Sequence, residues 1–217
     1  MRAKPGSEVV LFDGSGAEFS ARVERIGRSD VDLAVLERRE VDRELPVEIT
    51  LAVALPKGDR QRWLVEKAVE LGVARLQPLR TARSVAQPSS STLKRLRRAV
   101  IEASKQCGRN RLMEIEPPVD WPTLVARTTD RPCRLLAHPG GTADRQASFS
   151  AAATGRNPIL AVGPEGGFTD EEVATATTAG WQCVDLGPRI LRIETACLVM
   201  VAWAVDGGAA GPEEMQS

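Results

Sequence analysis

The sequence predicts an α/β fold in which a mostly parallel sheet is flanked by helices and preceded by a small antiparallel β unit. From Glu8 to Thr50, short apolar runs alternate with polar residues and are separated by turn signals at Asp13-Gly14 and Gly27, as in antiparallel strands. After Pro46, apolar strands instead alternate with helical segments, which is typical of a parallel sheet covered by helices. A chain of 217 residues buries about 70% of its unfolded surface, so it can build this core without metal or disulfides.

The α/β region begins with a strand, a helix and a second strand. The run ITLAVAL at 49–55 predicts the first strand, and VARLQPL at 73–79 predicts the second. Between them we expect a helix that opens near Asp59 and closes at Gly72. Its inward stripe is expected at Leu64, Ala68 and Leu71.

A second helix is expected after the Pro/Ser-rich stretch at 87–92. Its apolar face is predicted at Leu93, Leu96, Val100, Ala103 and Cys107, and the rest of its surface carries Lys94, Arg95, Arg97, Arg98 and Lys105. Residues 57–111 hold fourteen Lys and Arg against four Asp and Glu, although the whole chain is neutral. Such a face is often only solvated, but it also suits contacts with phosphates.

Three further strands are expected at 133–138, 158–163 and 181–187. Thr169 and Glu172 form a capping-box pattern for a helix that stops near Gly180. The apolar segment ETACLVMVAWAV at 194–205 predicts a helix buried in the core or in a subunit interface. We therefore expect a β domain over 1–46, an α/β domain over 47–206 and a disordered tail over 207–217.

Composition excludes several classes of site. The four cysteines form no CxxC pair and the chain has a single histidine, so no metal site or disulfide framework is expected, and each cysteine is expected to be a small buried side chain. No run of about 18 apolar residues spans a membrane, and MRAKPGSEVV lacks the features of a signal peptide. We expect a cytoplasmic protein with no membrane partner.

Two glycine-bearing turns follow late strands. Gly163-Pro164-Glu165-Gly166-Gly167-Phe168 follows the strand ILAV, and a glycine-rich turn at the end of a strand can form a ligand wall, although such a turn is more often only a turn. The chain contains neither a GxxxxGK[ST] loop nor a GxGxxG after a first strand, and no nucleophile elbow. The second turn is LGPRILRIETA at 186–196, where Glu194 and Thr195 fit helix-capping roles equally well.

Together, GPEGGF and LGPRILRIETA resemble the signature of the SPOUT-class methyltransferases that modify N3 of a uridine in 16S ribosomal RNA, the RsmE family. The resemblance extends to KGDRQRWLVEKAVELGVARLQPLRTARSV at 57–85 and EASKQCGR at 102–109. It implies a PUA-like β-barrel followed by an α/β domain with a deep trefoil knot, acting as a homodimer on the small ribosomal subunit. Members of this family usually begin with a further segment rich in His and Arg ahead of PGSEVVLFDG, so we expect part of the N-terminal barrel to be absent.

The resemblance also implies that the loops around residues 136–138, 163–167 and 186–196 bind S-adenosylmethionine (SAM). Backbone groups would contact the adenine edge, and Leu136, Ile190 and Leu191 would enclose the ring. The full set of expected cofactor residues is Leu136, His138, Gly163, Pro164, Glu165, Gly166, Gly167, Leu186, Gly187, Ile190, Leu191, Arg192, Thr195 and Ala196.

Methyl transfer to uracil N3 requires alignment of the reactants and loss of the N3 proton. Arg192 is the expected cation beside the uracil carbonyls, and Glu194 or Glu165 is the candidate base, although either carboxylate also has a structural explanation. The expected RNA-binding residues are Arg60, Arg62, Arg80, Arg83, Arg95, Arg98, Arg109 and Arg189. Two alternatives stay open: another SPOUT enzyme acting on tRNA or a ribose 2′-hydroxyl, and a non-catalytic RNA-binding protein of the same shape.

Overall fold

The computed structural model describes residues 3–85, 87–141, 143, 148–149 and 157–209. Contacts among the described residues divide the chain into two compact units. The first comprises Met1–Glu44 and Ser104–Leu112, and the second comprises Leu45–Ala103 and Met113–Ser217. Residues 210–217 of the predicted tail lie outside the described residues, whereas 207–209 belong to the last helix.

The first unit is built on an antiparallel sheet of three strands, β1 (Glu8–Phe12), β2 (Ala17–Ile26) and β3 (Val31–Glu40), in the order β1-β2-β3. The turn between β1 and β2 contains Gly14 and Gly16, whose φ angles of 90° and 108° are readily reached only by glycine. Asp13 stabilises this turn because its carboxylate accepts a hydrogen bond from the backbone N–H of Ser15 at 2.9 Å. The predicted antiparallel unit with a turn at Asp13-Gly14 is confirmed.

A segment distant in sequence, Ser104–Leu112, completes this unit. The side-chain amide of Asn110 donates to the backbone carbonyls of Gly16 at 3.0 Å and Val41 at 2.7 Å. Asn110 is 1% exposed, so these bonds satisfy a donor that water cannot reach. The segment therefore holds the β1–β2 turn to the chain that leaves β3.

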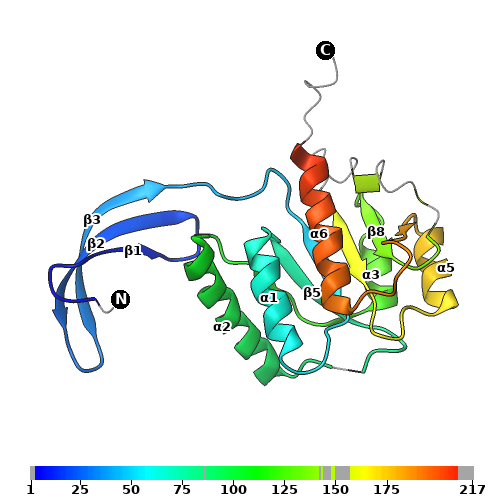
Figure 1. Cartoon of the computed structure of the whole chain (residues 1–217), viewed down its shortest axis with the longest axis horizontal. Coiled ribbons are helices and arrows are strands. Elements are labelled where there is room, and N and C mark those ends of the chain that lie inside the picture. Colours follow the sequence, from blue (N-terminus) through cyan, green and yellow to red (C-terminus); the bar gives the residue numbers. More distant parts are fainter. Residues whose placement is uncertain (1–2, 86, 142, 144–147, 150–156, 210–217) are drawn as a thin grey trace, which may run out of the picture. The chain divides into compact units, whose positions relative to one another are not determined.

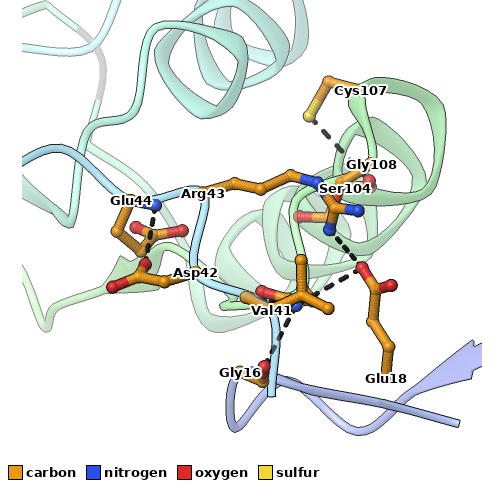
Figure 2. Close-up of polar contacts among 10 residues, drawn as sticks. Gly16, Glu18, Val41, Asp42, Arg43, Glu44, Ser104, Cys107 and Gly108 are labelled. Carbon is orange, nitrogen blue, oxygen red and sulfur yellow. Dashed lines mark hydrogen bonds and ion pairs between the residues drawn. The ribbon is translucent and has the colours of Figure 1, made fainter. Parts of the chain in front are cut away.

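Arg43 and Arg109 join the same segment to the residues that follow β3. Figure 2 shows Arg43 between the Glu18 carboxylate, with which it forms an ion pair, and the carbonyl of Gly108, to which it donates at 3.1 Å. Arg109 is 6% exposed, and its Nε lies 2.8 Å from Oε1 of Glu44. The expectation that Arg109 lies on an RNA-binding surface is wrong, because its cation is buried in an ion pair inside the protein.

We expect Arg109→Ala to destabilise the first unit by about 3 kcal/mol, because it leaves the partly buried carboxylate of Glu44 without its cation. Chemical denaturation followed by circular dichroism measures the change. Arg95→Ala is the matched control, since Arg95 is exposed and its side chain has no hydrogen bond or ion pair in the described part of the chain. Equal stability of the two variants would show that the buried pair contributes nothing.

The second unit contains a parallel sheet with helices. Its elements are β4 (Thr50–Val53), α1 (Arg60–Glu70), β5 (Arg75–Arg80), α2 (Ser90–Cys107, which continues into the first unit), β6 (Glu114–Ile115), β7 (Val119–Asp120), α3 (Trp121–Arg127), β8 (Arg134–Ala137), β9 (Ile159–Val162), α5 (Asp170–Thr178), β10 (Gln182–Val184) and α6 (Ile193–Ala209). The strand order is β10-β8-β9-β4-β5-β6, with β7 also paired to β5, and every pairing described is parallel.

Helices cover both faces of this sheet. Leu51 and Val53 of β4 point into an apolar cluster shared with α1, α2 and α6, whereas Ala52 and Ala54 point into a cluster shared with α3 and α5. This alternation follows from the two-residue period of a strand. Figure 1 shows α1 and α6 next to each other, and they are in contact over one face of the sheet. The predicted α/β fold with a mostly parallel sheet is confirmed.

The chain must return from β10 at one edge of the sheet to α6, which packs on β9 and β4. Because β8 lies between β10 and β9, the segment 185–192 passes the carboxyl end of β8 on the way. The trefoil knot that the resemblance implies stays a prediction. Among the described residues, the structure contains no α-helix with the length and apolar character of a bilayer span.

Local sequence signals located most elements correctly. Thr169 and Glu172 form the predicted capping box, with both reciprocal hydrogen bonds present. The apolar face of α2 is buried as predicted at Leu93, Leu96, Val100 and Ala103. Cys107 is an exception, because it lies exposed in the last turn of α2, and Cys183 is only partly buried.

Candidate functional site

Three loops meet at one edge of the second unit's sheet. They follow β8, β9 and β10, which are neighbours in the order β10-β8-β9 and run parallel. Parallel neighbours end at the same edge, so the loops starting at His138, Gly163 and Asp185 adjoin one another. These are the loops that the sequence predicted as the cofactor site.

The loops after β8 and β10 are joined by hydrogen bonds around Asp185. Its carboxylate accepts from the backbone N–H of Gly140 at 3.1 Å and from that of Gly187 at 2.8 Å. The backbone N–H of His138 also donates to the carbonyl of Val184 at 3.1 Å. One side chain thus fixes the backbone of both loops.

Gly141 lies directly against β10. A Cβ atom at this position would be 2.6 Å from the carbonyl oxygen of Cys183 and 2.9 Å from the backbone nitrogen of Asp185. Both are backbone atoms, which cannot rotate away as a side chain can. The close approach of the two loops therefore requires glycine at position 141.

Aromatic packing supports the glycine loop after β9. Gly163 lies under the ring of Phe168, which a Cβ at position 163 would approach to 2.9 Å. Phe168 in turn packs against Trp121 with ring centroids 4.7 Å apart, and the Trp121 indole N–H donates to the carbonyl of Glu172 at 3.1 Å. The loop therefore rests on a rigid base supplied by α3 and α5.

Arg60, at the start of α1, links the loop after β9 to the start of α6. Its guanidinium lies 3.5 Å from a carboxylate oxygen of Glu165 and 3.7 Å from Oε1 of Glu194. Glu194 is 7% exposed, and its Oε2 has no hydrogen-bond partner among the described residues. A buried carboxylate needs a nearby cation, so Arg60 stabilises the position of Glu194.

The apolar residues expected around a ligand ring occupy different environments. Leu136 is fully buried in the cluster beneath α3 and α5, so its side chain is a core side chain. Leu186 and Leu191 are half-buried against the α1, α2 and α6 cluster. Ile190 is 93% exposed. Of the other expected cofactor residues, Arg192 and Thr195 are exposed, His138 is partly exposed, and Gly163, Pro164 and Ala196 are buried.

Several arginines expected to bind RNA are paired within the protein. Arg62 pairs with Glu66 at 2.7 Å, and Arg80 with Asp120 at 2.7 Å. The hydrogen bond from Arg80 lowers the pKa of Asp120. By contrast, the guanidinium groups of the predicted site residues Arg95, Arg98, Arg189 and Arg192 have no hydrogen bond or ion pair in the described part of the chain, and all four residues are exposed.

The sequence analysis missed the residues that hold the loops together. Asp185 carries a recognisable signal, because an Asp two residues before a glycine forms an Asx turn, here with Gly187. Gly141 and the partners of Arg60 carry no local signal, since they act on segments distant in sequence. The described residues include no group of three or more His, Cys, Asp or Glu side chains placed to hold a metal ion.

Comparison with known proteins agrees with this arrangement. A family model described as RNA methyltransferase domain matches residues 43–205, and one described as RNA methyltransferase PUA domain matches residues 1–36. Curated relatives named ribosomal RNA small subunit methyltransferase E include one from Synechocystis, 34% identical over 93% of this chain and 67% of its own length. Another, from Bacillus subtilis, is 31% identical over 91% of this chain and 81% of its own length.

Solved structures agree as well. A Legionella pneumophila protein in complex with the bound cofactor SAM superposes with a TM-score of 0.86 and 33% identity, over 96% of this chain and 85% of that chain. Ribosomal RNA small subunit methyltransferase E from Neisseria gonorrhoeae, bound to S-adenosyl methionine, gives a TM-score of 0.80 and 31% identity, over 92% and 82%. The chain therefore belongs to the RNA methyltransferase family whose curated members are named ribosomal RNA small subunit methyltransferase E.

Proposed function

We propose that this protein transfers the methyl group of SAM to N3 of a specific uridine in 16S ribosomal RNA of the small subunit. The observation that carries the proposal is the meeting of three glycine-bearing loops at the carboxyl ends of β8, β9 and β10. Related proteins at 31–33% identity were solved with SAM bound, which supports the same cofactor here. Relatives named for the small-subunit RNA support the substrate class.

The residues at this edge fit the cofactor. Gly140, Gly167 and Gly187 all have positive φ, and apart from the adjoining residues no atom of the described part of the chain lies within 4 Å of where a Cβ would stand. The N–H groups of these glycines donate within the protein, two of them to Asp185 and one to the carbonyl of Pro164, so the loop backbone against which a ligand can lie is fixed. Leu186 and Leu191 supply apolar surface beside them. When bound, SAM supplies a methyl group on a sulfonium, and the protein's task is to hold the acceptor nitrogen in line with it.

Arg192 is the residue best placed to assist the acceptor. It is exposed at the entry to α6, and its guanidinium has no hydrogen bond or ion pair in the described part of the chain. A free cation can donate to a uracil carbonyl and stabilise the negative charge that grows there as the N3 proton leaves. Arg189, three residues earlier and equally exposed, would contact RNA or cofactor.

The two candidate bases differ in access. Glu194 is buried and faces Arg60, so its first role is to hold the start of α6 in place. The Glu165 side chain is 44% exposed and lies in the glycine loop, where it could accept a proton from a bound nucleotide. The proton acceptor is therefore proposed as Glu165, with Glu194 as the alternative.

The exposed cations of α2 form the proposed RNA surface of this unit. Lys94, Arg95 and Arg98 have no partner in the described part of the chain and are exposed along one helix. Contacts of such residues with phosphates position RNA and depend strongly on salt. Arg62 and Arg80 are paired on the surface with Glu66 and Asp120. They can bind RNA only if a phosphate replaces that carboxylate as their partner.

Two experiments test this function. Calorimetry with SAM is expected to show binding at one site per chain, and a protein that binds RNA but no SAM would be the non-catalytic alternative. Mass spectrometry of nucleosides from the ribosomal RNA of a deletion strain is expected to show the loss of one N3-methyluridine. Loss of a ribose methyl, or of a tRNA mark, would assign the protein to another SPOUT activity.

We also propose that two copies pair through α6. Leu198 and Val199 are only partly buried and Ala202 is exposed, and these residues share one face of the helix. An apolar face left open on an otherwise buried helix is typical of a subunit interface. Light scattering is expected to show a dimer for the wild type and a monomer for Ala202→Glu, and a wild-type monomer would remove the proposal.

Asp185→Ala is expected to weaken SAM binding about 10-fold to 100-fold, because two charge-assisted hydrogen bonds that shape the cofactor loops are lost together. The SAM affinity of Asp185→Asn should lie between those of Asp185→Ala and the wild type, since the amide oxygen of asparagine can still accept one hydrogen bond. Calorimetry measures the affinities. Asp130→Ala, at an exposed acidic residue after α3, is the control for the charge change. An Asp185→Ala variant that binds SAM as the wild type does would show that these bonds do not shape the site.

A further inference from the structure

The turn that follows β5 is rigid and is fastened to the glycine loop. Within the turn, the N–H of Thr81 donates to the hydroxyl of Ser84 at 2.9 Å, and the N–H of Ser84 donates to the carbonyl of Thr81 at 3.1 Å. β5 is not a neighbour of β9 in the sheet, because β4 lies between them. A contact from this turn to the loop after β9 must therefore cross the end of β4.

Arg83 makes that contact. Its Nη1 donates to the carbonyl of Gly166 at 2.7 Å and to that of Phe168 at 3.4 Å. Its aliphatic stem lies over Gly166, where a Cβ would come within 3.3 Å of the Arg83 Cδ. Arg83 therefore packs on the glycine loop as well as donating to it.

A second bond runs in parallel. The backbone N–H of Ala82 donates to Oε1 of Glu172 at 2.8 Å, while Oε2 of the same carboxylate accepts from the N–H of Thr169 at 2.9 Å. One glutamate thus caps α5 and holds the turn after β5. The turn is therefore attached at two points, by Arg83 to the glycine loop and by Ala82 to Glu172 of α5. A single contact would leave it free to rotate about that contact, whereas two contacts prevent this.

The hydrogen bond from Arg83 to the Gly166 carbonyl fixes the orientation of the Gly166–Gly167 peptide group. The glycine loop contains a turn in which the N–H of Gly167 donates to the carbonyl of Pro164 at 2.8 Å. The Gly166–Gly167 peptide joins two glycines, so no side chain restricts its orientation. Arg83 holds the carbonyl end of this peptide and Pro164 holds its N–H end. Both ends of the group are therefore set before any ligand arrives.

We infer that Arg83 is a positioning residue for the methyl donor, which holds the Gly166–Gly167 peptide in the orientation that SAM binding requires. This inference rests on the proposed function and replaces the expectation that Arg83 contacts RNA phosphates. Preorganisation of a loop strengthens binding because the ligand does not have to order it. The effect is therefore expected on SAM affinity itself, in the absence of RNA.

The test is calorimetry with SAM on the full chain without RNA. Arg83→Ala is expected to raise the Kd about tenfold or more, and Arg83→Lys, which can still donate to one carbonyl, should recover part of the affinity. Gly166→Ala should also weaken binding, because its methyl group pushes against the Arg83 stem. The matched control is Arg95→Ala, an exposed arginine with no partner in the described part of the chain, which should leave SAM affinity unchanged.

RNA binding measured over a range of salt concentrations separates the two roles of arginine. If Arg95 contacts a phosphate, Arg95→Ala is expected to reduce the salt slope, which is the slope of the logarithm of the RNA-binding constant against the logarithm of salt concentration, by about one unit. Arg83→Ala should leave this slope unchanged. Wild-type SAM affinity in both Arg83→Ala and Arg83→Lys, or a reduced salt slope with unchanged SAM affinity, would overturn the inference. A wild-type protein that binds no SAM would instead overturn the proposed function.

Discussion

Arg192→Ala is expected to lower the rate of methylation about 100-fold or more while leaving the Kd for SAM within about tenfold of the wild type. Arg192 is exposed and its guanidinium has no partner in the described part of the chain, so the loss of this side chain leaves no unpaired carboxylate and disturbs no internal contact. What is lost is a cation beside the uracil, where charge develops only as the N3 proton departs. Single-turnover methylation of small subunits, with calorimetry for SAM, measures both quantities.

Two companion variants make this result specific to position 192. Arg192→Lys keeps the charge but loses the planar donor pair, so it should retain part of the rate. Arg189→Ala removes an equally exposed arginine from the same loop and should act mainly on binding, through KM. Unchanged turnover in Arg192→Ala, or a loss of rate that follows SAM affinity alone, would remove Arg192 from the mechanism.

The sequence predicted the order of strands and helices in the second unit because the signals are local. The run ITLAVAL and the apolar spacing of Leu64 and Ala68 depend only on neighbours along the chain, and both elements formed where expected. Thr169 and Glu172 are three residues apart, so their capping box was visible as well. The strands β6 and β7 were missed because two residues give no measurable period, and helix α3 was missed because its seven residues make only about two turns.

The composition of a basic segment did not reveal which of its cations are free. Arg109 is 65 residues from Glu44 in sequence, and Arg83 is 83 residues from Gly166, so neither partner could be identified from spacing. The structure divides the predicted RNA-binding arginines into those whose guanidinium is paired with an internal acceptor and those whose guanidinium has no partner among the described residues. The unpaired ones, such as Arg95 and Arg98, keep a guanidinium ready for a phosphate.

The candidate site was partly predictable, because some of its signals are local in sequence. Both glycine motifs follow apolar strands, so their position at the ends of β9 and β10 could be deduced, but strand order could not. Because β8 lies between β9 and β10, the loop after β8 contributes to the site, and its contacts with β10 depend on Gly141 and Asp185. These two residues adjoin in space, yet they belong to different loops.

Gly141→Ala is expected to weaken SAM binding about 100-fold, which is the largest effect that we expect from a single methyl group in this chain. The added carbon would stand 2.6 Å from the carbonyl oxygen of Cys183 and 2.7 Å from its carbonyl carbon. Since these atoms belong to β10, the loop after β8 must move outward. That movement breaks the bond from Ala143 N–H to the Cys183 carbonyl, 3.2 Å long, and draws Gly140 away from Asp185.

The neighbouring glycine supplies a control that separates this clash from general loop strain. Gly140 has a φ of 74° and open space around its Cβ position, so Gly140→Ala costs about 1 kcal/mol of backbone strain without a clash. Its SAM affinity should fall less than about tenfold. Calorimetry on both variants, with thermal unfolding as a check of the fold, gives the comparison. If both bind SAM equally, the approach of the β8 loop to β10 does not determine the shape of the cofactor site, and the loops after β9 and β10 alone must form it.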